Sequence, residues 1–525
     1  MLRDLSKADQ SRQSIRADVA VIGGGLAGLL MASRLRRCGL RVVVLESGAA
    51  SQDNERHPLN EVIHSDHVYP GAEEGRFRCL GGTSSRWGGA MLPFLSSDLS
   101  FHPRGWDVEW PVSLADLGKE FSEVERLFKL PAGTFDVEGE SAPPSVSDQF
   151  QQRSAKWPRF RMRNVAYVVS QDLAQSGIDV WLNATATTFR LNESGRLAAV
   201  TAVSPTGKKL EVEAASFAIA AGAIESTRLL LLLDLQHENR FFGPDAILGR
   251  YFYDHLSASA ARIRPHDRDA LVNAFGLRFV HGGMRDCRLE PTASFRKKLD
   301  LPGAFSHVAA VPTNGDDGFT SLRTIYRAFQ RNALPRISDL TPLFRDFGWV
   351  MEATWWRFAK GRLVPPRHAV FELMLVTEQM PHSDNKITLS SERKDSTGSP
   401  MAEIKWRIRE PDLEAFRALQ SALLSYWSTS PYQSFGSLTA TPFEVWRKQM
   451  YEGGAIYHPG GSTRMGSSRT RGVVDGQLRT FAIPNIFVVS TSTFPSGGSA
   501  NPSFMLMALA LRAADRIAGD LGKRP

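Results

Sequence analysis

The fold is decided by the stretch Ala17-Asp18-Val19-Ala20-Val21-Ile22-Gly23-Gly24-Gly25-Leu26-Ala27-Gly28. Its first half is an apolar run that predicts a buried strand, and the residues after the glycines predict a helix that ends near Cys38-Gly39. Gly23 permits a tight turn, Gly25 lets the backbone approach a pyrophosphate, and Gly28 lets the helix pack closely on the sheet. The helix N-terminus adds unpaired N–H groups that attract phosphate. The stretch therefore predicts a dinucleotide-binding α/β domain.

An acidic residue supports the same reading. A second predicted strand, Arg41 to Leu45, ends at Glu46, which lies eighteen residues after Gly28. A carboxylate at this place accepts hydrogen bonds from both hydroxyls of an adenosine ribose and repels a 2′-phosphate. A glycine turn alone occurs in many α/β proteins, but here the strand, the turn, the helix and the acid agree. We predict a dinucleotide cofactor, and this motif does not distinguish NAD from FAD.

A second segment rich in glycine and hydroxyl groups runs from Leu80 to Gly89. It can donate backbone and side-chain hydrogen bonds to a second part of the same cofactor. The same composition also suits an ordinary surface loop. Further along, Phe217 to Ser226 predicts a strand that runs into a small-residue turn and returns the chain to the nucleotide sheet, and Asn485 to Ser490 predicts a final strand.

The C-terminal region contains a histidine in a glycine-rich turn, His458 to Gly466, and then Asn501-Pro502, which begins 43 residues after the histidine. An imidazole titrates near neutrality, so His458 is a candidate general base for an alcohol proton. Asn501 can hold the same hydroxyl by a hydrogen bond. Asn is also a favoured helix N-cap and Pro502 suits a first helical position, so a turn histidine and an ordinary cap are the alternative interpretation.

Together, these segments resemble the glucose–methanol–choline (GMC) family of FAD-dependent oxidoreductases. The resemblance covers roughly residues 17–50, 79–130, 180–255, 374–410 and 455–520. It implies FAD as the cofactor and a Rossmann-like α/β domain assembled from discontinuous segments. It also implies an α+β substrate domain whose antiparallel sheet faces the flavin ring.

The expected domain boundaries follow from the resemblance. We expect an FAD-binding domain at 17–255 and 456–520, a substrate-binding domain at 256–455 to which part of 90–180 contributes, and a polar N-terminal extension at 1–16. Three segments within the substrate domain predict strands that form the roof of the flavin pocket. They are Glu372–Thr377, Lys386–Ser390 and Ala402–Ile408.

The resemblance also assigns site residues. The catalytic residues are His458 and Asn501, and no metal ligand is expected. The residues expected to bind the cofactor are Gly23, Gly25, Gly28, Glu46, Gly82, Thr83, Ser84, Arg86, Trp87, Ala186, Ala221, Gly222, Ser490, Asn501 and Pro502. His255 is expected to be a structural residue where the chain leaves the FAD domain.

Within the family, Gly81 to Trp87 and Trp110-Pro111 look closest to sugar-acting bacterial members and pyranose oxidases. Several of those relatives have a histidine where Arg86 stands, and that histidine bonds covalently to the flavin. Arginine cannot make this bond, so we expect noncovalent FAD. The Arg86 guanidinium is expected either near phosphate or flavin, or in a surface ion pair.

The predicted reaction is the oxidation of a sugar or glycoside hydroxyl to a carbonyl by hydride transfer to flavin N5. His458 acts as the base and Asn501 orients the hydroxyl. The alternatives are oxidation of a non-sugar alcohol, an FAD-containing lyase of the same family that does no net redox chemistry, and a binding or membrane-docking subunit without catalysis. The expected electron acceptor is oxygen, a quinone or a redox protein.

Composition narrows the class of protein. The chain has 525 residues, of which 42% are hydrophobic, and these values suit a globular enzyme. Its net charge of +8 does not indicate nucleic-acid binding. Residues 1–16 contain no apolar run typical of a secretory signal, and the three cysteines have no metal-site spacing, so we expect a cytoplasmic protein unless a partner subunit carries an export signal.

One segment, 331–370, combines seven basic and three acidic residues with apolar residues at helical spacing. These apolar residues are Phe344, Phe347, Met351, Trp355 and Phe358. A basic amphipathic helix of this kind can contact a membrane surface or a partner subunit. It can also pack on the protein's own core or on a second copy in a homo-oligomer.

Overall fold

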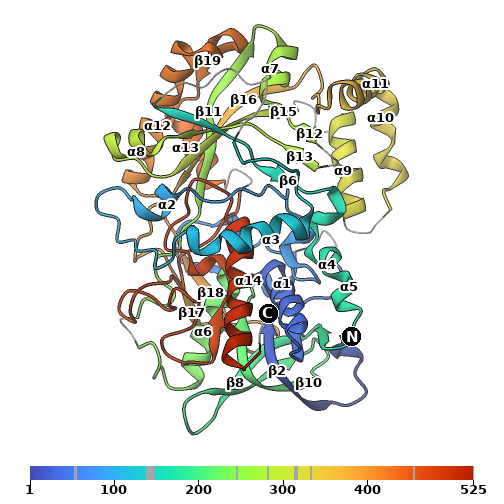
Figure 1. The fold of residues 1–525 in the computed structure, drawn as a ribbon, viewed down its shortest axis with the longest axis vertical. Coiled ribbons are helices and arrows are strands. Elements are labelled where there is room, and N and C mark those ends of the chain that lie inside the picture. Colours follow the sequence, from blue (N-terminus) through green and yellow to red (C-terminus); the bar gives the residue numbers. More distant parts are fainter. Residues whose placement is uncertain are drawn as a thin grey trace.

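The computed structural model describes residues 1–52, 56–136, 148–243, 246–280, 283–312, 317–330, 334–452 and 456–523. Figure 1 shows a lower part, built around a mainly parallel sheet, and an upper part, built around an antiparallel sheet. Each part has its own cluster of buried apolar side chains. This is the mixed α/β architecture that the sequence predicts.

The lower sheet has the strand order β1-β7-β3-β2-β10-β9-β8, with β20 also paired to β10. The strands are β1 (Leu2–Asp4), β2 (Arg12–Ile22), β3 (Val42–Leu45), β7 (Ile178–Leu182), β8 (Thr185–Leu191), β9 (Leu197–Val203), β10 (Lys209–Ile219) and β20 (Ile486–Val488). Strands β1, β7, β3, β2, β10 and β20 pair in parallel. Strands β3 and β20 and the C-terminal ends of β2 and β10 are apolar and buried, as expected where helices cover a parallel sheet.

Residues 1–16, expected as a polar extension, contribute to this sheet. Strand β1 pairs with β7, and Arg12 to Arg16 form the beginning of β2, where they pair with β10. The first half of β2 alternates between exposed and half-buried positions, so its polar residues face solvent on a strand instead of forming a loose end.

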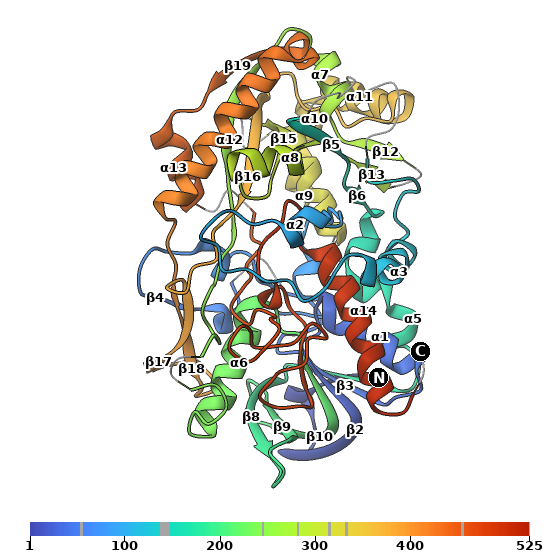
Figure 2. The same cartoon turned by 60° about the vertical axis from the view of Figure 1, so that its left-hand side comes forward.

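Helices from both ends of the chain cover the lower sheet. The predicted first helix is confirmed as α1 (Leu26–Arg37), and α14 (Ser503–Asp520) packs on it directly after Pro502. Helix α3 (Gly118–Phe128) packs on α14, and α6 (Ala223–Gln236) follows the turn after β10. Figure 2 shows α14 and α1 side by side in front of the lower strands.

The upper sheet is antiparallel and has the order β19-β11-β16-β15-β14-β5. Its strands are β5 (Phe150–Arg153), β11 (His255–Pro265), β14 (Arg288–Pro291), β15 (Ala304–Val311), β16 (Val370–Glu378) and β19 (Gly436–Ala440). The helices of this part are α7 (Arg268–Phe275), α8 (Ala293–Leu299), α12 (Glu410–Thr429) and α13 (Phe443–Tyr451). Strand β5 comes from within 90–180, the region expected to contribute here.

The prediction of the roof strands is wrong for two of the three segments. Strand β16 lies in the large antiparallel sheet, but β17 (Lys386–Lys394) and β18 (Pro400–Lys405) form a separate sheet with β4 (Ile63–His64) beside α6. The turn between β17 and β18 is fixed there because Asp395 pairs with Arg228 of α6. A strand pattern gives no information about such a distant partner.

The remaining elements are short or peripheral. They are β6 (Lys156–Trp157), β12 (Arg278–Val280), β13 (Gly283–Arg285), α2 (Ser96–Ser100), α4 (Val165–Val168), α5 (Ser170–Leu173), α9 (Gly318–Gln330), α10 (Thr341–Arg345) and α11 (Phe347–Trp355), which continues as a π-helical turn, Trp356–Lys360. Among the helices of the described residues, none is both long and apolar enough to cross a bilayer.

The five predicted apolar residues of the segment 331–370 do not pack on the protein's own core, although Trp356 and Val364 of the same segment do. Its residues 331–333 lie outside the described part. Phe344, Phe347, Met351, Trp355 and Phe358 are all more than half exposed. The segment forms short helices that break at Asp346, so no single continuous face turns inward. The alternatives that remain open are a membrane surface, a partner subunit and a second copy of the chain.

Candidate active site

The N-terminal glycine turn requires glycine at two positions for steric reasons. Gly23 has a φ of +109°, and a Cβ there would lie 2.5 Å from the carbonyl oxygen of Ala220. A Cβ on Gly28 would lie 2.0 Å from the carbonyl oxygen of Gly23. The turn, the first helical residues and the end of β10 are therefore in direct backbone contact, which is possible only without side chains.

The second glycine segment lies against this turn. The backbone N–H of Gly81 donates to the carbonyl of Gly24 at 2.8 Å, and a Cβ on Gly82 would lie 2.9 Å from the Cα of Gly25. A Cβ on Gly25 itself would have only Gly82 within 4 Å, at 3.9 Å. The two segments thus expose bare backbone at the N-terminus of α1, as a pyrophosphate requires.

Glu46 lies at the end of β3 and is buried. One carboxylate oxygen accepts the N–H of Gly24 and the other accepts the N–H of Gly48, each at 2.8 Å. Burial raises the pKa of Glu46, and these two hydrogen bonds oppose the increase. Because each oxygen has a further lone pair, the carboxylate can also accept two ribose hydroxyls.

The other predicted residues of the second segment have different surroundings. The Ser84 hydroxyl donates to the carbonyl of Gly81 and accepts the N–H of Val165, so it holds the loop. Thr83 is exposed. The Trp87 indole donates to the carbonyl of Arg163 at 2.7 Å. The Arg86 guanidinium stacks over the ring of Phe77 at 5.2 Å and donates to the carbonyl of Gln52.

The remaining predicted residues lie around the lower sheet. The N–H of Ala221 donates to the Ser226 hydroxyl, and Gly222, with a φ of +78°, is the N-cap of α6. The Ser490 hydroxyl accepts the N–H of Ser492. Ala186 is buried in β8, two residues beyond Ala184, whose N–H donates to the Glu46 carbonyl. None of these positions conflicts with a cofactor contact.

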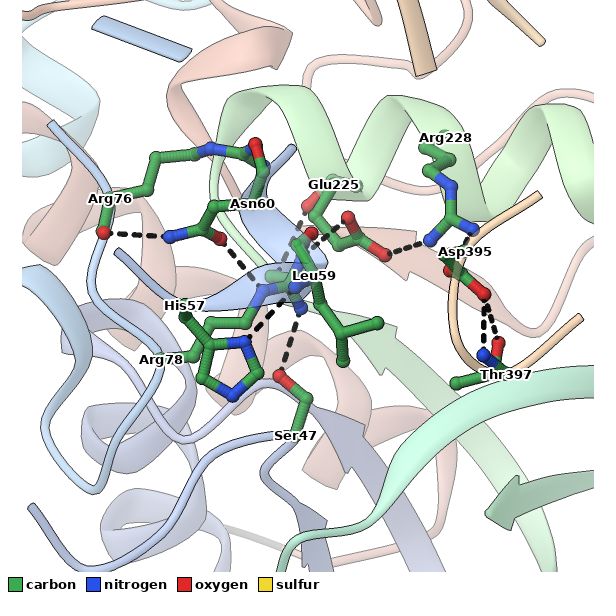
Figure 3. Close-up of polar contacts among 12 residues, drawn as sticks. Ser47, His57, Leu59, Asn60, Arg76, Arg78, Glu225, Arg228, Asp395 and Thr397 are labelled. Carbon is green, nitrogen blue, oxygen red and sulfur yellow. Dashed lines mark hydrogen bonds and ion pairs between the residues drawn. The ribbon is translucent and has the colours of Figure 1, made fainter. Parts of the chain in front are cut away.

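A buried ion cluster lies next to this region (Figure 3). Glu225 of α6 pairs with Arg78 at 2.8 Å through one oxygen and with Arg228 at 2.9 Å through the other. Arg78 also donates to the hydroxyl of Ser47, the residue after Glu46. Burial alone would raise the pKa of Glu225, but the positive charges around it lower the pKa to about 2. The cluster links the second glycine segment to α6.

The two predicted catalytic residues are in contact. The side-chain amide of Asn501 donates to Nε2 of His458 at 3.1 Å, and the Asn501 Oδ1 is buried with no partner among the described residues. Both residues line a cavity of about 430 Å³ that also has Trp87 in its wall. The turn after residue 456 and the residues before α14 therefore meet at one cavity.

A second histidine, His255, fixes the protonation of His458. Nε2 of His255 lies 2.9 Å from the carbonyl of Gly498, which can only accept, so Nε2 carries the proton. Nδ1 of His255 then accepts from Nδ1 of His458 across 3.3 Å. Because its proton lies on Nδ1, His458 has its lone pair on Nε2, the atom that faces Asn501.

Asp254 holds both histidines through their backbones. One of its oxygens accepts the N–H groups of His255 and His458, at 2.7 and 2.6 Å, and the other accepts the Tyr69 hydroxyl. Burial raises the pKa of Asp254 to about 7, although these hydrogen bonds oppose the increase. Burial also lowers the pKa of His458 well below its ordinary value, and nearby His255 and Arg288 add to the effect. The His458 imidazole is therefore neutral and able to accept a proton.

The cavity wall also contains residues for which the sequence gives no signal. Arg288 of β14 pairs with Asp286 at 2.9 Å and stacks over Phe305, and its Nη1 is buried without a partner among the described residues. His307 of β15 lines the same cavity, and burial lowers its pKa to about 4. These residues lie in strands, outside any motif. The sequence predicted a structural role for His255. The pair Asp254-His255, which follows Gly249, could have indicated that this histidine belongs to the site.

Comparison with known proteins agrees with this geometry. A family model described as GMC oxidoreductase matches residues 381–510, which include His458 and Asn501. The large subunit of fructose dehydrogenase from Gluconobacter japonicus is 21% identical over 97% of this chain and 99% of its own length. Paromamine 6'-oxidase from Streptomyces fradiae is 25% identical over 97% of this chain and 92% of its own. These matches identify the C-terminal region of the chain as a GMC oxidoreductase domain.

Two further matches cover the N-terminal glycine turn and the overall fold. A model described as lycopene cyclase protein matches residues 18–61, which contain the glycine turn and Glu46. The crystal structure of pyridoxine 4-oxidase from Mesorbium loti has a TM-score of 0.57 at 16% identity and covers 95% of this chain and 98% of its own. This structure shows that the fold is shared.

These matches decide between the two cofactors that the glycine turn left open: the protein is an FAD-dependent oxidoreductase that acts on alcohol groups. The bare backbone at Gly25 and Gly82 and the carboxylate of Glu46 suit the pyrophosphate and the ribose of FAD. When it is bound, FAD supplies the hydride acceptor at its N5.

We predict that the FAD of this GMC oxidoreductase is released when the protein unfolds. Arg86 has no chemistry for a covalent flavin bond, and its side chain is held by Phe77 and Gln52. Precipitating the purified protein with acid should leave the yellow flavin in the supernatant. Flavin that stays in the protein pellet would contradict the prediction and would indicate another attachment residue.

Proposed function

We propose that this GMC oxidoreductase oxidises a sugar or glycoside hydroxyl to a carbonyl, with His458 as the general base and Asn501 as the orienting group. The observation that carries the proposal is the Nε2 atom of His458, which has a lone pair and faces Asn501 inside the cavity. The sugar class is supported by relatives that cover nearly the whole chain, two of which are named for fructose and paromamine.

The geometry suggests how the alcohol is held. A hydroxyl that enters between the two side chains can donate its proton to Nε2 of His458 and accept a hydrogen bond from the Asn501 amide. Because these groups are 3.1 Å apart, the amide must move aside to admit it. Nε2 would then take the hydroxyl proton, and the Asn501 amide would hold the alcohol in a fixed orientation for a bound flavin, which is the positional part of the rate gain.

We propose the same domain division as above, with FAD held by 17–255 and 456–520 and the substrate held mainly by 256–455. The two glycine segments and Glu46 lie within 17–255, and Asn501 lies within 456–520. Two polar residues that line the cavity, Arg288 and His307, come from the substrate range.

One observation favours the second candidate, a non-sugar alcohol. Apolar side chains form most of the remaining cavity wall, among them Leu271, Phe275, Phe319 and Phe371. An apolar wall binds hydrocarbon better than a polyol, because it offers few hydrogen bonds to hydroxyl groups.

Anaerobic reduction of the bound flavin tests these candidates. We expect sugars or glycosides to bleach the flavin absorbance faster than aliphatic alcohols of similar size. If simple alcohols bleach it and no sugar does, the substrate is a non-sugar alcohol. Turnover of a compound with the flavin permanently oxidised would indicate a lyase. Mixing the reduced enzyme with air and with a quinone then identifies the class of electron acceptor.

We predict that His255 is a positioning residue for this reaction. His255→Leu removes the acceptor for Nδ1 of His458 and frees the imidazole to change tautomer, so flavin reduction should slow by up to about 10²-fold. His255→Asn places an amide oxygen near the lost Nδ1 and should restore part of the rate. Equal rates in both variants, with equal FAD content, would mean that His255 only fills space.

A further inference from the structure

Large apolar side chains are concentrated on one surface of the upper part. Of the eighteen large hydrophobic side chains exposed in the described residues, ten lie between Tyr326 and Phe358. The four most exposed of all are Leu334 at 88%, Ile337 at 86%, Phe358 at 81% and Phe344 at 77%. We call the segment 318–360, which contains α9, α10 and α11, the apolar lobe. Figure 1 shows it at the edge of the molecule, away from the lower sheet.

The apolar lobe is attached to the core by its inner side chains. Trp356 is buried in the upper core cluster, and Ile325 of α9 is also buried. The Trp349 indole donates to the carbonyl of Val364 at 3.3 Å, and its ring meets that of Phe319 edge-on at 5.9 Å. The exposed side chains therefore project from a fixed surface. A patch of this kind marks a contact with another molecule.

The lobe and the residues after it are also strongly basic. Residues 318–367 contain nine basic and three acidic residues, a net charge of +6, whereas the whole chain carries +8. The three carboxylates are engaged within the protein. Asp339 accepts the N–H of Arg336, Asp346 accepts that of Gly318, and Glu352 pairs with Arg268 and Arg367.

We propose that the apolar lobe docks the protein on the surface of an anionic lipid bilayer. Phenylalanine, leucine and isoleucine side chains that project from a basic surface enter the interface, while arginine and lysine contact the negative headgroups. Charge decides against a second copy of the chain, because a symmetric contact would bring two basic segments together. An anionic bilayer matches both the apolar and the basic character.

The apolar lobe lies next to the cavity that contains His458, so docking on a bilayer would affect how other molecules reach this cavity. Phe319 of α9, and Leu363 and Pro365 just after the lobe, line the same cavity as His458. A bilayer that covers the lobe therefore lies against the outer wall of this cavity. A lipid-soluble substrate or electron acceptor would then reach the cavity without crossing bulk water.

Vesicle co-sedimentation of the FAD-loaded protein tests the proposal. We expect the protein to sediment with vesicles of phosphatidylcholine and phosphatidylglycerol, to sediment much less with phosphatidylcholine alone, and to dissociate as salt is raised. Phe344→Glu with Phe358→Glu should weaken binding about tenfold or more. Arg336→Gln should weaken it about fivefold, the usual effect of one basic residue at an anionic surface.

Matched variants test whether a loss of vesicle binding is specific to the apolar lobe and is not caused by misfolding. Val68→Glu and Val445→Glu alter exposed apolar residues outside the lobe, at 62% and 46% exposure, and should leave vesicle binding unchanged. All variants should retain FAD and the wild-type rate of flavin reduction in solution, which shows that they are folded. Absence of vesicle binding, or binding that the lobe variants do not weaken, overturns the proposal. Concentration-dependent dimerisation abolished by Phe344→Glu, without vesicle binding, would assign the lobe to a second copy.

Discussion

Replacing His458 with alanine is expected to slow reduction of the bound flavin by about 10²–10⁴-fold, the usual size of a general-base effect. The variant keeps the backbone N–H that Asp254 accepts, so the turn should stay in place. Rapid mixing with substrate under anaerobic conditions measures the rate. The matched control is His67→Ala, because that side chain is 53% exposed and is not among the residues that line the cavity.

The pH dependence provides a second readout of the same residue. Burial lowers the pKa of His458 well below its ordinary value of 6.5, so the imidazole stays neutral and basic as pH falls through 6.5. We expect the rate of flavin reduction in the wild type to stay constant as pH falls through 6.5 and to decrease only at lower pH. If His458→Ala reduces its flavin at the wild-type rate, His458 is not the base. If the rate of the wild type halves near pH 6.5, the pKa of His458 is not lowered as its burial predicts.

Glu225→Gln is expected to lower the free energy of unfolding by about 3–5 kcal/mol, because it removes the carboxylate that pairs with the buried Arg78, whereas Arg228 keeps Asp395. Arg78 and Arg228 both lose their shared carboxylate in this variant (Figure 3). Urea unfolding of the FAD-loaded protein measures the change. The control, Glu213→Gln, removes a carboxylate that also pairs with two arginines, Arg16 and Arg190, but at the surface, and should have a far smaller effect.

The effect of Glu225 on stability should depend on pH in a defined direction. Its pKa is about 2 in the folded protein and 4.5 ordinarily, so the folded state favours the ionised form. The stabilisation is complete above pH 4.5 and is lost as pH falls from 4.5 toward 2. The difference between wild type and Glu225→Gln should therefore shrink over this range. A difference that is already small at neutral pH would mean that the arginines find other partners.

Local sequence patterns predicted the parts of the fold that short segments determine. Gly28 is required by its contact with the nearby Gly23, and Glu46 follows the neighbouring strand, so a pattern of about thirty residues contains them. Gly23 also fits this pattern, although the backbone that it contacts, at Ala220, directly follows a distant strand. The His458 and Asn501 pair is separated by 43 residues, and it was identified through family resemblance because neither residue has a local signature of contact.

The rest of the site depends on pairing between distant segments. Arg288 and His307 meet in the cavity because β14 pairs with β15, and nothing in either strand indicates that register. His255 was assigned a structural role because a histidine after a strand boundary does not show which ring it faces. Strands β17 and β18 were recognised as strands, but their sheet was not, since their position depends on Arg228 of α6.

The cavity wall has a chemical asymmetry that bears on which bond reacts. Arg288 and His307 face the interior and are close enough to His458 for the charge of Arg288 to affect both imidazoles, whereas the wall next to the apolar lobe is formed by Phe319, Leu363 and Pro365. A molecule with one polar and one apolar end can satisfy both walls in only one direction. Regioselectivity among chemically similar hydroxyl groups would then be set by the direction of entry, before any difference in their intrinsic reactivity matters.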